Sequence, residues 1–254
     1  MKILPFIKMH GLGNDYVYLD CFRESTAKVM AAANLPALAR AMSDHHFGIG
    51  SDGLVLILPS DKADAKMRIF NADGSEAEMC GNAIRCVAKY LYENGIFRDD
   101  RMAIETLAGV RSLTLHVSQE KVDQVTVDMG LPTLEERVWQ DLPYLSVNMG
   151  NPHAVFFHEP IDTLPPNTNV EFVRVRNSKE LDVRVIERGS GATMACGTGA
   201  CASAVAAIYK GLTDRHVTVH LPGGALTVQW TTDDSSLRMT GPATEVFRGE
   251  WQYE

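Results

Sequence analysis

The sequence lacks the features that mark membrane and nucleic-acid-binding proteins. Its most continuous apolar stretch, Leu54 to Pro59, is far shorter than the roughly 20 residues that a membrane-spanning helix needs. Lys8 and His10 interrupt the apolar N-terminal segment, which argues against a signal peptide. The 24 Lys and Arg residues are outnumbered by 32 Asp and Glu, so no basic surplus is present to neutralise phosphates. We therefore expect a soluble cytoplasmic protein without nucleic-acid or membrane partners.

Cysteine is also scarce. The five cysteines are an odd number and include no C-x-x-C pair, which argues against a disulfide framework and a zinc ribbon. His45 and His46 have no second pair with which to complete a metal site, so no metal is expected. Three of the cysteines are interpreted as small buried hydrophobes. They are Cys21, Cys86 and Cys201.

The chain contains an internal repeat. An Arg, a polar residue, a Cys and a Gly recur in the same order, 12 and 9 residues before the Cys and 15 after it, at a common offset of 116 residues. Agreement at this many fixed positions indicates two similar halves. The repeated residues are Arg68, Asn71, Cys80 and Gly95 in the first copy and Arg184, Glu187, Cys196 and Gly211 in the second.

Each copy predicts one central helix surrounded by strands. The segments 82–94 and 198–210 are rich in Ala, Val, Ile, Leu and Tyr, lack helix breakers and end at a Gly suited to a C-terminal cap. Two further helices are expected at 27–32 and 35–43. Most of the remainder alternates β-branched and polar residues between turn signals. We predict an α+β fold with two pseudo-symmetric domains, each a curled, mostly antiparallel sheet around a central helix.

The repeat also predicts the domain boundaries. Residues 1–124 form one half in this interpretation, and residues 125–241 form the other. The closing segment 242–254 is expected to return to the first half, which otherwise lacks a final strand. The active site is expected in the cleft between the two halves.

The two repeated cysteines indicate acid–base chemistry at a carbon atom. Cys80 and Cys196 both precede a predicted helix, where unpaired N–H groups and a partial positive charge bind carboxylates and lower a thiol pKa. Two such sites facing each other would place one sulfur on each side of a bound carbon. One thiolate then takes a proton while the opposite thiol returns another, which inverts the stereocentre.

Four segments resemble the signature segments of the diaminopimelate epimerase family. They follow the family's order and spacing along essentially the whole chain. The resemblance implies a cofactor-independent epimerase that interconverts LL- and meso-diaminopimelate in lysine and peptidoglycan precursor biosynthesis, as a cytoplasmic homodimer. The segments are His10-Gly-Leu-Gly-Asn-Asp15, Asn71-Ala-Asp-Gly-Ser75 with Cys80-Gly-Asn82, Met149-Gly-Asn-Pro-His153, and Glu187-Arg-Gly189 with Ala195-Cys-Gly-Thr-Gly-Ala200.

The resemblance also implies roles for individual residues. Cys80 and Cys196 are the catalytic acid–base pair, and His153 and Glu187 are expected near Cys80 and Cys196, respectively, where they support proton exchange. Arg188 suits the distal carboxylate because a guanidinium donates two parallel hydrogen bonds. The residues expected to bind substrate are Asn14, Asn71, Gly81, Asn82, Asn151, Asn169, Glu187, Arg188, Gly197 and Thr198.

Two positions depart from the commonest family pattern. Gly53 stands where some members carry Gln, and Ala192 replaces a frequent Glu, so the side-chain contacts at both positions are open. The segment Gly48 to Gly53 matches G-x-G-x-x-G, but a strand-like run follows it where a dinucleotide site needs a helix. We therefore reject nucleotide binding.

Two alternatives to the epimerase stay open at this point. One is a related isomerase on the same duplicated fold, either an amino-acid racemase of the proline type or a phenazine-pathway isomerase. The other is a redox sensor that uses Cys80 and Cys196 as a switch. A sensor has no need for two carboxylate-binding helix starts or for the cluster of asparagines.

Overall fold

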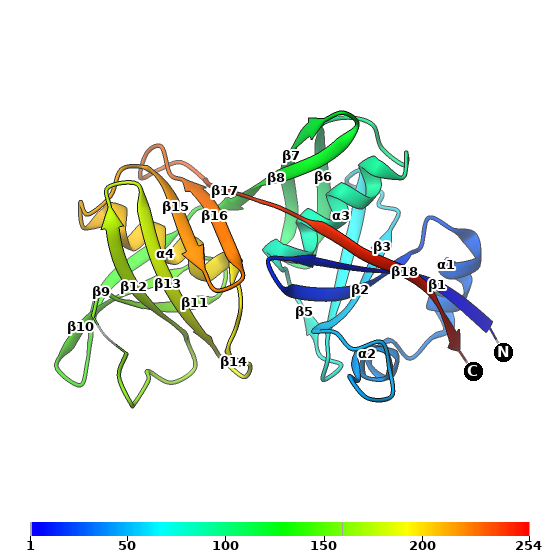
Figure 1. The fold of residues 1–254 in the computed structure, drawn as a ribbon, viewed down its shortest axis with the longest axis horizontal. Coiled ribbons are helices and arrows are strands. Elements are labelled where there is room, and N and C mark those ends of the chain that lie inside the picture. The colour runs from blue at the N-terminus through cyan, green and yellow to red at the C-terminus, as the bar shows by residue number, and fades with distance from the viewer. Residues whose placement is uncertain (1, 159, 254) are drawn as a thin grey trace. The chain divides into compact units, whose positions relative to one another are not determined.

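The structure of the chain consists of two units. The computed structural model describes residues 2–158 and 160–253. Unit 1 comprises Met1–Val125 and Pro242–Glu254, and unit 2 comprises Thr126–Gly241. The chain passes into unit 2 within strand β8, and Figure 1 shows both units with their elements labelled.

The sheet of unit 1 combines antiparallel pairs with two parallel ones. Strand β1 pairs antiparallel with both β18 and β2, and β3–β4 and β6–β7 are antiparallel hairpin-like pairs. The β2–β3 and β4–β6 pairs are parallel. The short β5 extends β4 on its outer side. The strands are β1 (Lys2–Gly11), β2 (Asn14–Asp20), β3 (Gly53–Leu58), β4 (Ala65–Asn71), β5 (Glu76–Ala77), β6 (Arg101–Thr106), β7 (Gly109–Ser118), β8 (Lys121–Gly130) and β18 (Thr244–Tyr253).

Unit 2 repeats the same pairing pattern with different strands. Strand β10 pairs antiparallel with β9 and β11, while β12–β13, β15–β16 and β16–β17 are also antiparallel. The β11–β12 and β13–β15 pairs are parallel, as their counterparts are in unit 1. The strands are β9 (Thr133–Trp139), β10 (Leu142–Asn148), β11 (Pro152–Phe156), β12 (Asn169–Asn177), β13 (Glu180–Glu187), β14 (Gly191–Ala192), β15 (His216–Leu221), β16 (Gly224–Gln229) and β17 (Leu237–Gly241).

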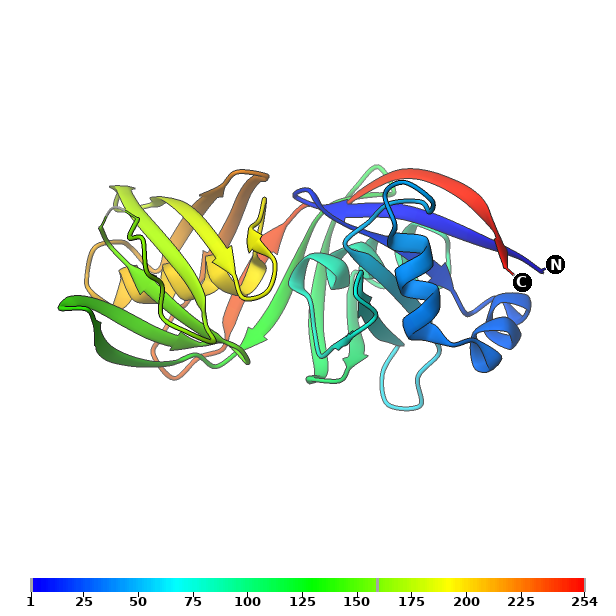
Figure 2. The same cartoon turned by 90° about the horizontal axis from the view of Figure 1, so that it is seen from below.

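Each unit wraps its sheet around one central helix. Helix α3 (Gly81–Glu93) lies in unit 1 against β1, β2 and β7, and α4 (Gly197–Tyr209) lies in unit 2 against strands from β10 to β17. Figures 1 and 2 show both helices enclosed by strands of their own unit. Nearly every residue of α4 is apolar and buried, as expected for a helix surrounded on all sides. The predicted fold class, a curled sheet around a central helix made twice, is confirmed.

The two central helices begin and end one residue earlier than the sequence pattern indicated. The predicted ranges were 82–94 and 198–210, whereas α3 and α4 start at Gly81 and Gly197. The reason is local, because the preceding cysteine takes the N-cap position and its sulfur accepts an N–H of the first turn. Beyond the helix ends, Gly95 (φ 72°) and Gly211 (φ 67°) adopt the left-handed conformation that terminates helices.

Two helices are present in unit 1 without a counterpart in unit 2. Helices α1 (Glu24–Ala32) and α2 (Leu35–Ser43) connect β2 to β3, close to the ranges expected from the sequence. The Asn34 side chain caps α2 by accepting from Ala37 N–H at 3.2 Å. In the corresponding connection of unit 2, between β11 and β12, the described residues form no helix.

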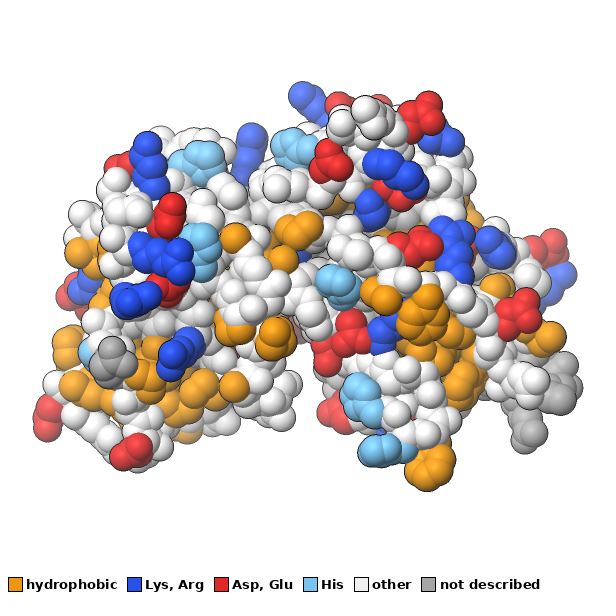
Figure 3. All heavy atoms as spheres, viewed as in Figure 1, with side chains coloured by type: hydrophobic (Ala, Val, Ile, Leu, Met, Phe, Trp, Pro, Cys, Tyr) orange, Lys and Arg blue, Asp and Glu red, His pale blue; other side chains and the backbone are white. Residues whose placement is uncertain are grey.

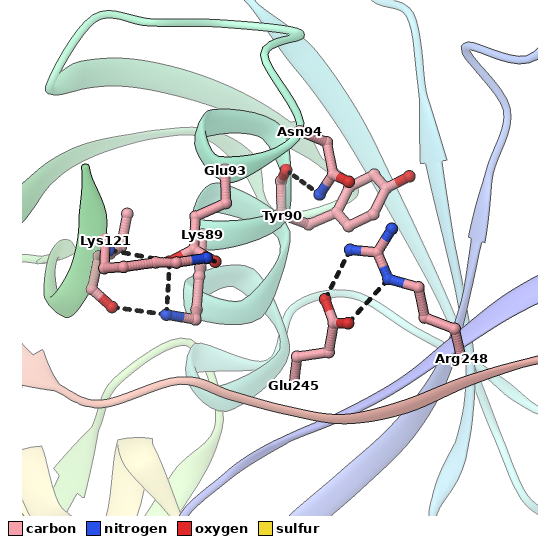
Figure 4. A network of polar contacts seen from close by, with 8 residues as sticks. Lys89, Tyr90, Glu93, Asn94, Lys121, Glu245 and Arg248 are labelled. Carbon is pink, nitrogen blue, oxygen red and sulfur yellow. Dashed lines mark hydrogen bonds and ion pairs between the residues drawn. The ribbon is translucent and has the colours of Figure 1, made fainter.

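A polar network ties the last turn of α3 to the start of β8 (Figure 4). Lys89 Nζ donates to Glu93 Oε1 at 2.8 Å and to the Val122 carbonyl at 2.7 Å. Val122 N–H donates to the same Glu93 oxygen at 2.9 Å, and Lys121 Nζ lies 3.3 Å from Glu93 Oε2. Since three of these partners converge on one largely buried carboxylate, the far end of α3 is fixed against the sheet.

Among residues 2–158 and 160–253, no helix combines the length and apolar character that crossing a bilayer requires. On the face drawn in Figure 3, Lys and Arg side chains are interspersed with Asp and Glu.

Candidate active site

Cys80 occupies the N-cap position of α3. Its backbone is extended (φ −138°, ψ 119°), and its Sγ accepts a hydrogen bond from Ala83 N–H at 3.5 Å. The side chain is half-buried. The first N–H groups of a helix have no partner within the helix, so they attract a negative charge to this position.

Asn14 and Asp52 position the polar groups around Cys80. The Cys80 thiol donates to Asn14 Oδ1 at 3.4 Å, and Asn82 Nδ2 donates to the same oxygen at 3.2 Å. Asp52 Oδ2 accepts from Asn14 Nδ2 at 2.7 Å and from Asp15 N–H at 3.0 Å. Burial raises the pKa of Asp52, against the hydrogen bond from the Asp15 backbone. The orientation of the Asn14 amide therefore depends on Asp52.

A fully buried arginine lies beneath the first turn of α3. Arg85 donates to the Gly81 carbonyl at 2.8 Å, to Asn82 Oδ1 at 2.9 Å and to the Pro242 carbonyl at 3.1 Å. A Cβ atom on Gly11 would lie 2.8 Å from Arg85 Nη2, so the strand can pass the guanidinium only because residue 11 is glycine. These bonds offset the cost of burying the charge and fix the Asn82 amide.

Cys196 takes the equivalent position at the start of α4 but is more deeply buried. Its backbone is extended (φ −117°, ψ 115°), and Sγ accepts from Gly199 N–H at 3.4 Å. Only 5% of the residue is exposed. Burial raises the pKa of Cys196 well above 9.0, and the nearby carboxylate of Glu187 raises it further. Without other charges at the site, Cys196 is held as a thiol.

A chain of side chains leads from Cys196 into the interior of unit 2. Thr198 Oγ1 lies 3.5 Å from Cys196 Sγ and accepts from Asn151 Nδ2 at 3.3 Å. Asn151 Oδ1 lies 3.0 Å from His153 Nε2, and His153 Nδ1 lies 2.7 Å from Glu171 Oε1. His153 and Glu171 are both completely buried. The sequence analysis named Thr198, Asn151 and His153 as site residues but expected His153 near Cys80, whereas hydrogen bonds within unit 2 connect it to Cys196. Glu171 was missed.

Asn169 and Glu187 shape the loop that carries Arg188. Asn169 Oδ1 accepts from Arg188 N–H at 2.9 Å, and its Nδ2 donates to the Pro152 carbonyl at 3.3 Å. Thr193 donates from its hydroxyl to Glu187 Oε1 at 2.6 Å. The Arg188 side chain is exposed, and its guanidinium has no ion-pair partner among the described residues.

Three positions discussed in the sequence analysis lie outside the hydrogen-bond groups around Cys80 and Cys196. They are Asn71 and the two departures from the family pattern, Gly53 and Ala192. Asn71 donates to Ser75 Oγ at 3.0 Å within the turn that follows β4, so its side chain stays with its own turn. A Cβ atom on Gly53 would lie 2.1 Å from the Phe70 carbonyl oxygen, so no side chain fits there in this structure. Ala192 is exposed on the two-residue strand β14. The segment Gly48 to Gly53 runs into β3, as expected, and opens no helix.

Three supporting residues were missed by the sequence analysis: Asp52, Arg85 and Glu171. Of these three residues, only Glu171 could have been recognised from the sequence. It stands two residues after Asn169 on a strand, so the two polar side chains share the face that the strand period assigns to the core. Cys21, Cys86 and Cys201, the three cysteines interpreted as structural, are buried. No group of three or more potential metal ligands occurs among the described residues.

Comparison with known proteins identifies the family. The family model for diaminopimelate epimerase matches residues 6–135 and 145–246. The chain belongs to the diaminopimelate epimerase family. It is 47% identical to the diaminopimelate epimerase of Pelotomaculum thermopropionicum, over 98% of this chain and 99% of that protein. It is 48% identical to the diaminopimelate epimerase of Geobacillus kaustophilus, over 100% of this chain and 98% of that protein.

Solved structures with low sequence identity share the fold of this diaminopimelate epimerase family member. A PhzF-family phenazine biosynthesis protein from Bacillus anthracis superimposes with a TM-score of 0.77 at 16% identity, over 100% of both chains. A hydroxyproline epimerase from Agrobacterium vitis gives a TM-score of 0.71 at 15% identity, over 98% of this chain and 92% of that chain. The duplicated architecture is thus common to proteins with different reactions, and fold alone does not choose between them.

Proposed function

We propose that this protein is a diaminopimelate epimerase that interconverts the LL and meso forms through a pair of cysteines. The observation that carries the proposal is the repeated placement of Cys80 and Cys196 as N-cap residues of two enclosed helices. Family membership supports the substrate, because relatives with this name match along nearly the full length of both chains.

The proposed reaction exchanges one proton on each face of the α-carbon. A thiolate at one of the two cysteines removes the α-proton and becomes a thiol. The thiol at the other cysteine donates its proton to the opposite face and becomes a thiolate, so protons and charge balance and the configuration inverts. No cofactor takes part in this scheme. The raised pKa of Cys196 supports its role as the proton donor when Cys80 removes the α-proton.

The N–H groups at the two helix starts are suited to hold the reacting carboxylate. In this proposal the backbone of Gly81 and Asn82 contributes from α3, and that of Gly197 and Thr198 contributes from α4. The negative charge that develops as the α-proton leaves is stabilised by the same groups. Each unit supplies one thiol and one helix start to a single substrate, so residues 1–124 with 242–254 and residues 125–241 act as two halves of one site.

The polar side chains are proposed to recognise the rest of the substrate. Arg188 is assigned to the distal carboxylate, which agrees with its exposed guanidinium and with the Asn169 bond that holds its backbone. His153 and Glu187 support proton exchange. The asparagines Asn14, Asn71, Asn151 and Asn169 complete the binding set. The enzyme is proposed to act as a cytoplasmic homodimer in lysine and peptidoglycan precursor biosynthesis.

Proton exchange in deuterated water tests the proposal. The purified protein is incubated with LL-diaminopimelate in deuterated buffer containing a thiol reductant, and the α-proton signal and the meso product are followed by NMR. We expect loss of the α-proton signal together with formation of the meso isomer. Intact LL-diaminopimelate after prolonged incubation would contradict the proposal.

Parallel incubations separate the alternatives. Trans-4-hydroxyproline and proline replace diaminopimelate in matched samples, and exchange confined to these would favour a racemase of the proline type. Exchange with none of the amino acids, combined with reversible oxidation of Cys80 and Cys196 under mild peroxide, would favour the redox sensor.

A further inference from the structure

The position of Glu171 breaks the symmetry of the two repeats at a completely buried site. In unit 1, Leu54 pairs with Phe70, and in unit 2, Val170 pairs with Ile186, which lies 116 residues after Phe70. The register therefore places Glu171 where unit 1 has Val55. An ionisable residue that replaces an apolar one in a buried sheet breaks a local rule of folding, and such residues concentrate at functional sites.

Only one of the two carboxylate oxygens of Glu171 has a hydrogen-bond partner. Its Oε1 meets His153 Nδ1 at 2.7 Å, while Oε2 has no hydrogen-bond partner and is buried. Gly199, in the first turn of α4, makes room for it, since a Cβ atom there would lie 2.7 Å from Glu171 Oε1. An ionised carboxylate with one oxygen unpartnered is costly in an apolar interior, whereas the neutral acid is far less so.

We propose that Glu171 is a positioning residue that holds a proton against His153 Nδ1 and thereby sets the direction of the hydrogen-bond chain to Cys196. With the proton on the Glu171 side, Nδ1 accepts and the ring hydrogen lies on Nε2. The imidazole then donates to Asn151 Oδ1, the Asn151 amide donates to Thr198 Oγ1, and the Thr198 hydroxyl is left to donate to Cys196 Sγ.

The direction of the chain matters for the charge on Cys196. A hydroxyl that donates to the sulfur stabilises the thiolate, as does the Gly199 N–H, and both act against the burial that raises the pKa of Cys196. Burial also raises the pKa of Glu171, against the charge of His153, which agrees with a neutral acid at this position. In the reverse direction, the Thr198 hydroxyl would donate to Asn151 and the sulfur would lose this donor.

This inference rests on the proposed function for its consequence but can be tested without substrate. In protein labelled with ¹⁵N-histidine, the His153 ring signals are assigned by comparison with His153→Gln. We expect the proton on Nε2, with Nδ1 as an acceptor, in spectra recorded at about pH 8. A His153 ring that carries its proton on Nδ1 and is bare at Nε2 would overturn the inference.

Glu171→Gln is the informative substitution because a Gln side chain keeps the volume and offers either an acceptor or a donor to Nδ1. We expect both ring tautomers in the ¹⁵N spectrum, and a kcat for diaminopimelate at least about tenfold lower, with KM changed less than about threefold. Glu180→Gln is the matched control, since Glu180 lies 3.4 Å from the imidazole of His220 but is 42% exposed. It should leave kcat and the His153 signals unchanged.

The outcomes separate positioning from packing. A Glu171→Gln protein with unchanged ring signals overturns the inference, whether its kcat is normal or falls together with its thermal midpoint. If the wild-type protein shows the expected Nε2 proton but does not epimerise diaminopimelate, the assignment of the chain stands and the proposed function fails.

Discussion

Helices α3 and α4 begin alike, with a cysteine as N-cap residue, yet different side chains lie beneath their first turns. Five residues after the cysteine, α3 carries the buried Arg85, whereas α4 carries the buried Cys201. Beside the first turn of α4, strand β12 carries the buried Glu171 where β3 of unit 1 has Val55. The first helix start therefore lies next to a buried cation, and the second lies next to a buried acid.

The strands next to the two cysteines pair in the same register, but one of the two polar positions that they share carries different residues. The strand pairings place Asn14 and Asn151 at equivalent positions, and they place Tyr16 where unit 2 has His153. Burial raises the pKa of Tyr16 well above 10.0, and the charge of Cys80 raises it further, so this position stays neutral. Duplication thus preserved the backbone geometry of the two helix starts, while the side chains around each thiol diverged. The two cysteines therefore have different electrostatic surroundings.

Removing either repeated cysteine should have the largest effect. We expect Cys80→Ala and Cys196→Ala each to lower the rate of epimerisation by about 10³-fold or more, because one face of the α-carbon loses its proton donor or acceptor. Cys86→Ala and Cys201→Ala serve as controls, since both thiols are buried within the same helices, and these variants should keep most of the activity. Formation of the meso isomer measured by NMR decides the matter, and normal turnover by Cys196→Ala would exclude the two-thiol scheme.

Replacing the buried cation should mainly affect stability. Arg85→Met leaves the oxygens of Gly81, Asn82 and Pro242 without their donor, at a cost of about 3 kcal/mol in the free energy of unfolding. Cys201→Ala, at the equivalent position of α4, should cost less because a neutral thiol, not a charged guanidinium, is removed. Urea unfolding of both variants provides the comparison. If both variants lose the same free energy of unfolding, Arg85 stabilises unit 1 no more than Cys201 stabilises unit 2.

Asp52 offers a milder test of the unit 1 site. In Asp52→Asn the charged oxygen that accepts from both Asn14 Nδ2 and Asp15 N–H is replaced by a neutral amide, which can present either its oxygen or its N–H₂ group to these donors. The Asn14 amide is therefore held less firmly in its orientation. We expect kcat to fall about tenfold, in line with the loss of one oriented hydrogen bond of about 1.4 kcal/mol. Asp61→Asn, an exposed substitution in the same unit, is the control. Steady-state kinetics in which the two variants behave alike would show that Asp52 does not position Asn14 for catalysis.

The smallest expected effect concerns the charge beside Cys196. The Glu187 carboxylate raises the pKa of Cys196, so Glu187→Gln should lower this pKa and shift the pH dependence of Cys196 alkylation to lower pH. At a fixed mildly alkaline pH, the thiol should react a few-fold faster, as more of it is ionised. The rate is measured with iodoacetamide and peptide mapping. A shift to higher pH would mean that the hydrogen bond from Thr193 to Glu187 matters more than the charge.

The sequence alone was sufficient to predict the architecture. The 116-residue offset predicted the duplication, and the Ala-rich segments ending at glycine predicted both central helices to within one residue. These features are local or periodic, so they can be recognised without contacts. The signature segments named Thr198, Asn151 and His153, which the structure links to Cys196, but they implied a place near Cys80 for His153 and did not include Glu171.

Only the tertiary structure decided what lies beneath the two helix starts. Asp52 reaches Asn14 across 38 residues of chain, and Arg85 reaches Pro242 across 157, because sheet pairing and helix packing bring distant segments together. Whether a charged residue is buried depends on the elements folded over it, and no pattern within its own segment records that. The electrostatic difference between Cys80 and Cys196 therefore follows from long-range packing, while their shared place as N-cap residues follows from the sequence next to them.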